Sequence, residues 1–119
     1  MNSPPVRGQI VFVTLPQDPP GKGPRPVIVV SVDARNRHPR AHDVLIVPLS
    51  TSVHKSSYPA HLLLSAGETG LSADSIARAE DITVVAKSAL SESRSPLRVV
   101  SNRRICELAE KVTFAMGCV

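Results

Sequence analysis

The stretch GKGPRPVIVV, residues 21–30, places two glycines and two prolines around Arg25 and then runs directly into an apolar segment. Residues 26–33 (PVIVVSVD) are apolar at successive positions, which predicts a strand buried on both faces of a sheet. Residues 17–25 are rich in proline, which lacks a backbone N–H and fixes φ, so they can form neither a helix nor a central strand. We therefore expect an exposed loop that ends at Arg25.

On either side of this stretch, short β-type segments alternate with turns. Three further segments combine apolar and β-branched residues with flanking Gly, Pro or Ser and are predicted strands: residues 8–15, 44–50 and 60–65. One or two more strands are predicted over residues 75–87, with a break near Glu80 and Asp81. The polar segments between strands are expected to be connecting loops and turns: residues 34–43, 50–59 and 65–75.

The end of the chain has a helical period. In residues 102–116 apolar side chains recur at steps of three and four, which predicts one amphipathic helix, with Ser101 as its candidate N-cap. The apolar positions are Ile105, Leu108, Ala109, Val112, Ala115 and Met116. Short strands joined by Gly and Pro turns, followed by one helix, predict a mainly β (α+β) fold. We expect a small barrel or a strongly bent sheet with the helix packed across it.

Composition narrows the class of protein. With 119 residues, 42% of them apolar, the chain can bury one core, so we expect residues 1–119 to form a single domain. Fourteen Lys and Arg against ten Asp and Glu give a net charge of +4, which modestly favours an anionic partner such as nucleic acid. The sequence has no apolar run as long as a membrane span, and its start lacks the apolar segment of a signal peptide, so a cytoplasmic protein is expected.

The cysteines and histidines do not suggest a metal centre. Cys106 and Cys118 lack a CxxC spacing and are expected to be free thiols. The histidines lie near predicted turns without metal-ligand spacing, and we interpret all four as solvated loop residues: His38, His42, His54 and His61. Neither a metal ion nor a cofactor is expected.

Four segments in chain order carry a resemblance to a known family: RGQIVFV (7–13), RPVIVVS (25–31), VLIVPLSTS (44–52) and GLSADSIARAEDITVVAKSAL (70–90). Together they resemble the MazF/PemK toxins, the ribonuclease halves of bacterial toxin–antitoxin pairs. The resemblance implies a small, strongly twisted, SH3-like β-barrel of the CcdB/MazF/PemK type, usually a homodimer. It also implies metal-independent cleavage of single-stranded RNA at short sequences, inhibition of translation, and neutralisation by a cognate antitoxin.

Arg25 is the first candidate catalytic residue. Attack of a ribose 2′-hydroxyl on the adjacent phosphorus requires positive charge on the phosphorane oxygens, and a guanidinium stays protonated and can contact two phosphate oxygens at once. Pro24 and Pro26 restrict the backbone on both sides, whereas Gly21 and Gly23 leave the preceding loop free to move. Arg25 also matches the catalytic arginine that the resemblance implies for the RPV motif. The alternative is an arginine that only solvates a strand end.

A hydroxyl pair follows the third predicted strand. The family places Ser or Thr directly after its PL dipeptide to donate a hydrogen bond to the scissile phosphate, and Ser50 holds that position with Thr51 next to it. Because consecutive strand side chains point to opposite faces, we expect only one of them, Ser50, to face the site. The alternative is that these hydroxyls cap a turn.

Arg78 and Glu80 form the third candidate group. Two residues apart on a strand, they are expected on one face, where the carboxylate accepts a proton and the guanidinium holds the phosphate. The resemblance implies the same roles for an Arg-x-Asp segment, with Glu80 in place of the Asp. Where the family pattern reads DQIRT, residues 80–84 of this chain read EDITV, with Asp81 in place of Gln. The alternative is a surface ion pair between Arg78 and Glu80.

Contacts to the rest of the RNA are expected from loops, because Phe12, Tyr58 and Phe114 are the only aromatic residues and offer no stacking platform. The candidate RNA-binding residues are Gly21, Lys22, Gly23, Lys55 and Asp81, with Arg35, Arg37 and Arg40 as further basic loop residues. Two other functions stay open: a CcdB-like gyrase-binding toxin and a catalytically silent RNA-binding module. The first is disfavoured because that family relies on a tryptophan near its C-terminus and this chain has none.

Overall fold

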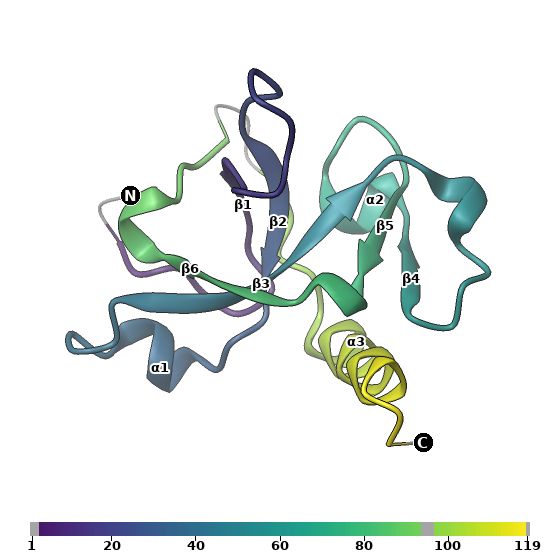
Figure 1. Cartoon of the computed structure of the whole chain (residues 1–119). Coiled ribbons are helices and arrows are strands. Elements are labelled where there is room, and N and C mark those ends of the chain that lie inside the picture. Colours follow the sequence, from purple (N-terminus) through teal and green to yellow (C-terminus); the bar gives the residue numbers. More distant parts are fainter. Residues whose placement is uncertain (1–2, 94–96, 119) are drawn as a thin grey trace.

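A bent antiparallel sheet and one long C-terminal helix form the body of the molecule (Figure 1). The computed structural model describes residues 3–93 and 97–118. The strands are β1 (Ile10–Val13), β2 (Arg25–Val29), β3 (Asp43–Ser50), β4 (His61–Leu64), β5 (Ser75–Arg78) and β6 (Thr83–Ala86). The α-helices are α1 (Asp33–Arg37), α2 (Ala66–Thr69) and α3 (Asn102–Ala115), and the 3₁₀ turns are η1 (Val53–Lys55), η2 (Ala79–Asp81) and η3 (Lys87–Ala89).

Strand β3 organises the sheet, whose order is β1-β2-β3-β5-β4 with β6 also paired to β3. One edge of β3 pairs with β2, and the other edge pairs with β6 over residues 43–46 and with β5 over residues 49–50. The segment β5–η2–β6 therefore follows a single edge of β3 and is interrupted by the η2 turn. Of the one or two strands predicted over residues 75–87, the structure has two, and the predicted break near Glu80 and Asp81 is confirmed.

Pro48 shows why a proline fits inside this central strand. Val30 N–H donates to Leu45 O at 2.9 Å, and the alternation of an antiparallel ladder then directs the nitrogen of Pro48 away from β2. It faces the interval between the part of β3 that pairs with β6 and the part that pairs with β5. The missing N–H of Pro48 therefore falls where that edge of β3 has no ladder partner.

The core has two parts because β2 and β3 bury both of their faces. Ile28 and Val47 belong to a cluster that includes residues of β4, β5 and α3, whereas Val27 and Val29 belong to a second cluster with residues of β1. This confirms the prediction that residues 26–33 contain a strand buried on both sides, although the strand itself ends at Val29.

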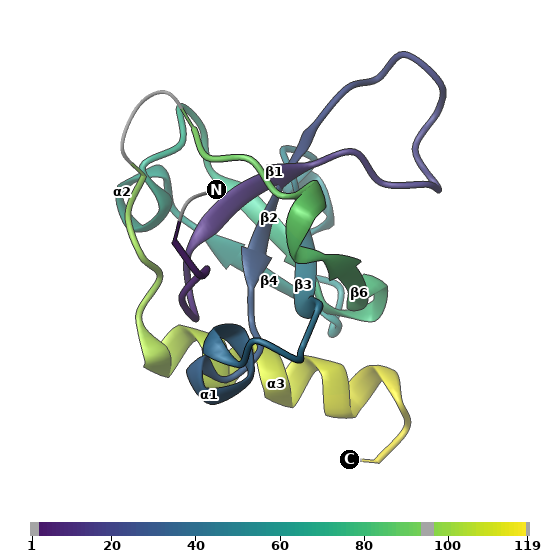
Figure 2. The ribbon, with the colours of Figure 1, turned by 90° about the vertical axis from the view of Figure 1, so that its left-hand side faces the viewer.

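Helix α3 packs on the first of these clusters. Ser101 caps it by accepting a hydrogen bond from Arg104 N–H, and Ile105 and Leu108 are buried in the core, as the periodicity predicts. Three other positions of the predicted apolar face are exposed: Ala109, Ala115 and Met116. The last two are exposed because the C-terminal turns of the helix extend past the sheet (Figure 2). No helix in residues 3–93 and 97–118 is long and apolar enough to span a membrane.

Two short helices lie in segments that the sequence analysis treats as connections. Helix α1 follows β2, and α2 begins with a capping box in which Ser65 and Glu68 exchange hydrogen bonds. Burial alone would raise the pKa of the Glu68 carboxyl, but the hydrogen bonds from Ser65 and the charge of Arg104 outweigh it and lower the pKa. Arg104 Nε lies 2.9 Å from Glu68 Oε1, so this ion pair ties α2 to α3.

Candidate active-site cleft

A cleft of about 380 Å³ opens where β3 ends and β2 begins. It brings together three segments that are far apart in the sequence: the β1–β2 loop, the end of β3 and the segment before β5. Its lining residues are Lys22, Pro24, Arg25, Pro26, Leu49, Ser50, Thr51, Ser52, Leu71, Ser72, Ala73 and Ser75. Four of the residues predicted for the site thus share one concave surface: Lys22, Arg25, Ser50 and Thr51.

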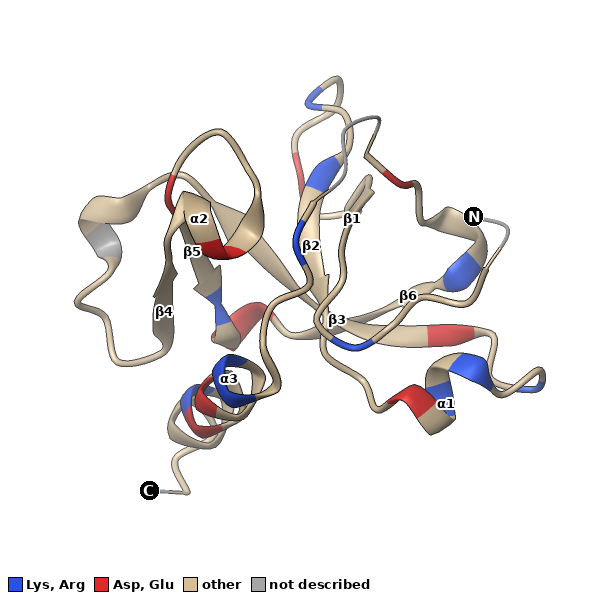
Figure 3. Cartoon of the chain, turned by 180° about the vertical axis from the view of Figure 1, so that it is seen from behind, with Lys and Arg blue, Asp and Glu red and all other residues tan. Residues whose placement is uncertain are grey.

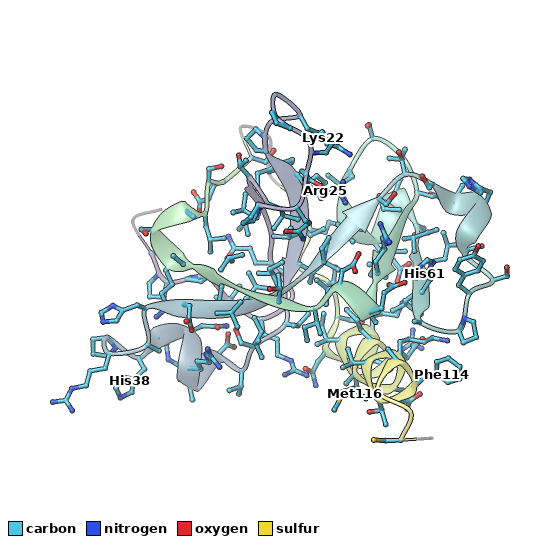
Figure 4. The ribbon with its side chains drawn as sticks, viewed as in Figure 1. Lys22, Arg25, His38, His61, Phe114 and Met116 are labelled. Atoms are coloured by element: carbon cyan, nitrogen blue, oxygen red, sulfur yellow. The ribbon has the colours of Figure 1, made fainter. Side chains whose placement is uncertain are left out.

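Arg25 is the first residue of β2 and pairs with Val13 of β1. Its side chain is only 15% exposed, and its Nη2 lies 3.0 Å from Oδ1 of Asp18 in the β1–β2 loop. Figure 4 shows Arg25 at the base of this loop and Lys22 near its tip. Sequence reasoning did not identify Asp18, because nothing in the sequence distinguishes it from a solvated loop carboxylate.

The tip of the β1–β2 loop stands clear of the rest of the protein (Figure 2). Gly21 and Gly23 have φ angles of 83° and 80°, in the left-handed region that favours glycine, and an added Cβ at either position would meet no atom within 4 Å. Lys22, between them, is exposed, so its charge lies on an unpacked arm beside the cleft. Viewed from behind in Figure 3, the loop carries acidic and basic segments in succession.

Ser50 and Thr51 both line the cleft. The alternation argument for Ser50 alone does not extend to Thr51, because β3 ends at Ser50 and Thr51 already lies in a bend, so the choice of Ser50 stays a prediction. Ser50 Oγ also accepts a hydrogen bond from Ser52 N–H at 3.2 Å, so the hydroxyl caps a turn as well as lining the cleft. The side chain of Lys55, another predicted RNA contact, lies outside the part of the chain that the structure describes.

A small cavity of about 30 Å³ adjoins the cleft and shares Ser50 and Ser52 with it. Arg78 lines this cavity, and its Nε lies 3.3 Å from Oδ2 of Asp81. The expectation that Arg78 and Glu80 lie on one strand face, or pair with each other, is therefore wrong: β5 ends at Arg78, and η2 turns Glu80 in a different direction. Asp81, a predicted RNA contact, instead neutralises Arg78.

His61 is the functional candidate that the sequence analysis missed. It is 3% exposed, lines the small cavity, and its Nε2 lies 2.7 Å from Glu80 Oε2. Its ring also stacks on Tyr58, with centroids 5.1 Å apart. The interpretation of His61 as a solvated residue is thus wrong, while His38, His42 and His54 are exposed as predicted. Side chains alternate between the two faces of β4, so His61 lies on the face opposite the core residues Leu62 and Leu64. On that face, Glu80 and Tyr58 contact it.

Comparison with known protein families decides the assignment. The model for the PemK-like, MazF-like toxin of type II toxin-antitoxin systems matches residues 6–116. The chain belongs to this family. No curated protein sequence matches the chain significantly.

Solved structures of similar fold cover nearly the whole PemK-like toxin. An endoribonuclease from a mycobacterial species, in complex with its cognate antitoxin, is 25% identical, with a TM-score of 0.72 and 97% of each chain covered. MazF from Deinococcus radiodurans is 21% identical, with a TM-score of 0.73, and the alignment covers 98% of this chain and 99% of MazF. The second likeness supports the fold, which agrees with the predicted mainly β architecture and C-terminal helix.

The cleft of this PemK-like toxin supplies groups that can stabilise negative charge, whereas Glu80, the carboxylate predicted to accept a proton, lines neither the cleft nor the small cavity. Arg25 and Lys22 supply positive charge, Ser50 and Thr51 supply hydroxyl donors, and the Glu80 carboxylate lies beyond the small cavity, hydrogen-bonded to His61. Among residues 3–93 and 97–118, no group of three or more His, Cys, Asp or Glu side chains could hold a metal ion.

Proposed function

We propose that the protein is an endoribonuclease toxin that cleaves single-stranded RNA in the cytoplasm, including messenger RNA, and so inhibits translation. The observation that carries this proposal is the meeting of Arg25, Ser50 and Lys22 in one cleft of a PemK-like fold. Family membership and the likeness to the mycobacterial endoribonuclease support the same activity.

In the proposed reaction the 2′-oxygen of a ribose bonds to the adjacent phosphorus and the bond from phosphorus to the 5′-oxygen breaks. The Arg25 guanidinium and the Ser50 hydroxyl stabilise the charge that builds on the non-bridging oxygens. Glu80 accepts the 2′-hydroxyl proton, and the leaving 5′-oxygen takes a proton from water. The products are a 2′,3′-cyclic phosphate and a 5′-hydroxyl end.

The first prediction concerns metal ions. Since the proposed stabilising charge comes from the Arg25 guanidinium, purified protein should cut a mixed-sequence single-stranded RNA equally fast with and without excess EDTA. The measurement is the single-turnover rate, with the Arg25→Ala variant, purified in the same way, as a control for contaminating nucleases. Cleavage that stops in EDTA and returns with magnesium would contradict the mechanism. No cleavage by wild-type protein under any condition would favour the silent RNA-binding module.

The second prediction concerns a protein partner. We propose that a cognate antitoxin inhibits the protein through an acidic segment, since the chain has a net charge of +4 and the cleft presents Lys22 and Arg25. The mycobacterial relative was solved with its cognate antitoxin, which supports this. A small protein encoded beside this toxin should co-purify with it and abolish RNA cleavage. The pairing is wrong if a stoichiometric amount of that protein leaves the cleavage rate unchanged.

A further inference from the structure

Arg25, which lines the cleft, forms an ion pair with Asp18 of the β1–β2 loop. Asp18 is 8% exposed at its side chain, and its Oδ1 lies 3.0 Å from Nη2 of Arg25. Its other oxygen, Oδ2, is buried and has no hydrogen-bond partner in the described part of the chain. From this geometry, and resting on the proposed function, we propose that Asp18 is a positioning residue that orients the Arg25 guanidinium for phosphate.

Burial of this ion pair carries a desolvation cost. A carboxylate removed from water loses its hydration, and only a well-placed cation and further hydrogen bonds compensate for that loss. Here Arg25 satisfies one oxygen while the second stays unsatisfied, so the location of the carboxylate depends strongly on Arg25. The dependence is mutual: a guanidinium on a long flexible stem gains a fixed orientation when one of its N–H groups is held by a buried acceptor.

The location of Asp18 favours positioning over blockage of the site. Arg25 lines the cleft but Asp18 does not, so the carboxylate contacts the guanidinium from outside the space where a phosphate would bind. A guanidinium has five N–H donors, and the contact with Asp18 Oδ1 leaves others for phosphate oxygens. The carboxylate and an RNA phosphate can therefore bind different edges of the same planar group.

The pair also divides the β1–β2 loop into a fixed part and a free part. Asp18 N–H donates to Leu15 O at 3.1 Å, so the residue is held at the strand end by its backbone as well as by its side chain. Beyond it, an added Cβ at Gly21 or Gly23 would face open space. Movement of the tip can thus occur without displacing Arg25.

The experiment compares Asp18→Asn and Asp18→Ala with wild-type protein. We expect kcat to fall about 10- to 100-fold, because a catalytic group misplaced by about 1 Å can cost about 100-fold in rate. Affinity for an uncleavable 2′-deoxy substrate should stay unchanged or increase, since Arg25 then carries an unneutralised charge. Asp18→Asn should lose less than Asp18→Ala because the amide oxygen can still accept from the guanidinium. Asp43→Asn is the matched control, because Asp43 also pairs with an arginine, Arg35, but at the opposite end of β3.

Two further measurements separate positioning from a purely structural role. In an Arg25→Ala background, Asp18→Asn should cause no additional loss of rate, because Asp18 acts through the missing guanidinium. An equal loss in both backgrounds, or a variant that cleaves as fast as wild type or faster while folded, would overturn the inference. The second measurement is the ¹⁵N relaxation of the Arg25 Nε–H, which should report a rigid side chain in wild type and a mobile one in Asp18→Ala.

The relaxation measurement does not depend on catalysis and so distinguishes two kinds of failure. If wild-type protein cuts no RNA but the Arg25 side chain is rigid and becomes mobile in Asp18→Ala, the proposed function is wrong and the positioning contact holds. If wild-type protein cuts RNA and the mobility of Arg25 is the same in both proteins, the inference about Asp18 is wrong and the proposed function holds.

Discussion

Replacement of Arg25 by alanine should slow single-turnover cleavage of RNA by about 100- to 1000-fold. If Arg25 stabilises the phosphorane, its contacts strengthen as charge develops, so the loss falls mainly on the transition state. Affinity for a 2′-deoxy substrate should fall by only about fivefold, the effect of losing one phosphate contact worth on the order of 1 kcal/mol. The two measurements on the same variant separate catalysis from binding.

Arg25→Lys and a distant arginine variant complete this test. Lysine keeps the charge but not the planar two-pronged geometry, so it should restore only a small part of the lost rate. Arg103→Ala is the control, because Arg103 lies on α3 with its side chain 80% exposed and pairs with Glu107 of the same helix. A melting curve confirms that each variant folds. If a folded Arg25→Ala protein cuts at nearly the wild-type rate, Arg25 has no catalytic role and serves only as the ion-pair partner of Asp18.

The next largest effect is expected at Glu80. Glu80→Gln keeps the shape of the side chain and an oxygen that can face His61 Nε2, but it removes the ability to accept a proton, so cleavage should fall by about 100-fold or more. Glu80→Asp keeps the carboxylate one methylene further back and should lose less. The measurement is again the single-turnover rate at saturating protein.

Glu110→Gln provides the matched control for Glu80, since Glu110 is exposed on α3, away from the cleft. It should cut RNA at the wild-type rate. If folded Glu80→Gln also does so, then Glu80 serves only as the hydrogen-bond partner of buried His61, and another group accepts the 2′ proton. His61→Gln should then lower the melting temperature without a selective loss of cleavage rate.

The elements that follow from local periodicity could be predicted from the sequence. The apolar run after Arg25 gives β2, the break at Glu80 and Asp81 separates β5 from β6, and the three- and four-residue steps give α3. The signal for α2 was also present, because Ser65 and Glu68 have capping-box spacing, but the neighbouring glycines favoured a turn. The bounds of α3 agree with the prediction, but the exposure of its last apolar residues could not be predicted, because periodicity shows which face is apolar and not where the sheet beneath it stops.

The site was only partly predictable, for a different reason. Arg25, Ser50 and Thr51 lie within recognisable motifs, and the structure brings them together. The partners of the charged groups could not be read from the sequence, because they depend on how loops fold back on the sheet. Asp18 reaches Arg25 across the β1–β2 loop, and Glu80 reaches His61 because β4 and β5 are paired and η2 turns back over them.

The arrangement of β5, η2 and β6 along one edge of β3 has a consequence for how the chain tolerates insertions and deletions. Both strands pair with the same partner, so the length of η2 is fixed from both ends. Removing one residue there would shift β6 by one position and turn its side chains to the opposite face of the sheet, or move Glu80 away from His61. The tip of the β1–β2 loop has no such constraint, because an added Cβ at Gly21 or Gly23 would meet no atom within 4 Å. Changes in chain length around this cleft can therefore accumulate at the Lys22 side, while the segment that carries Glu80 must keep its length.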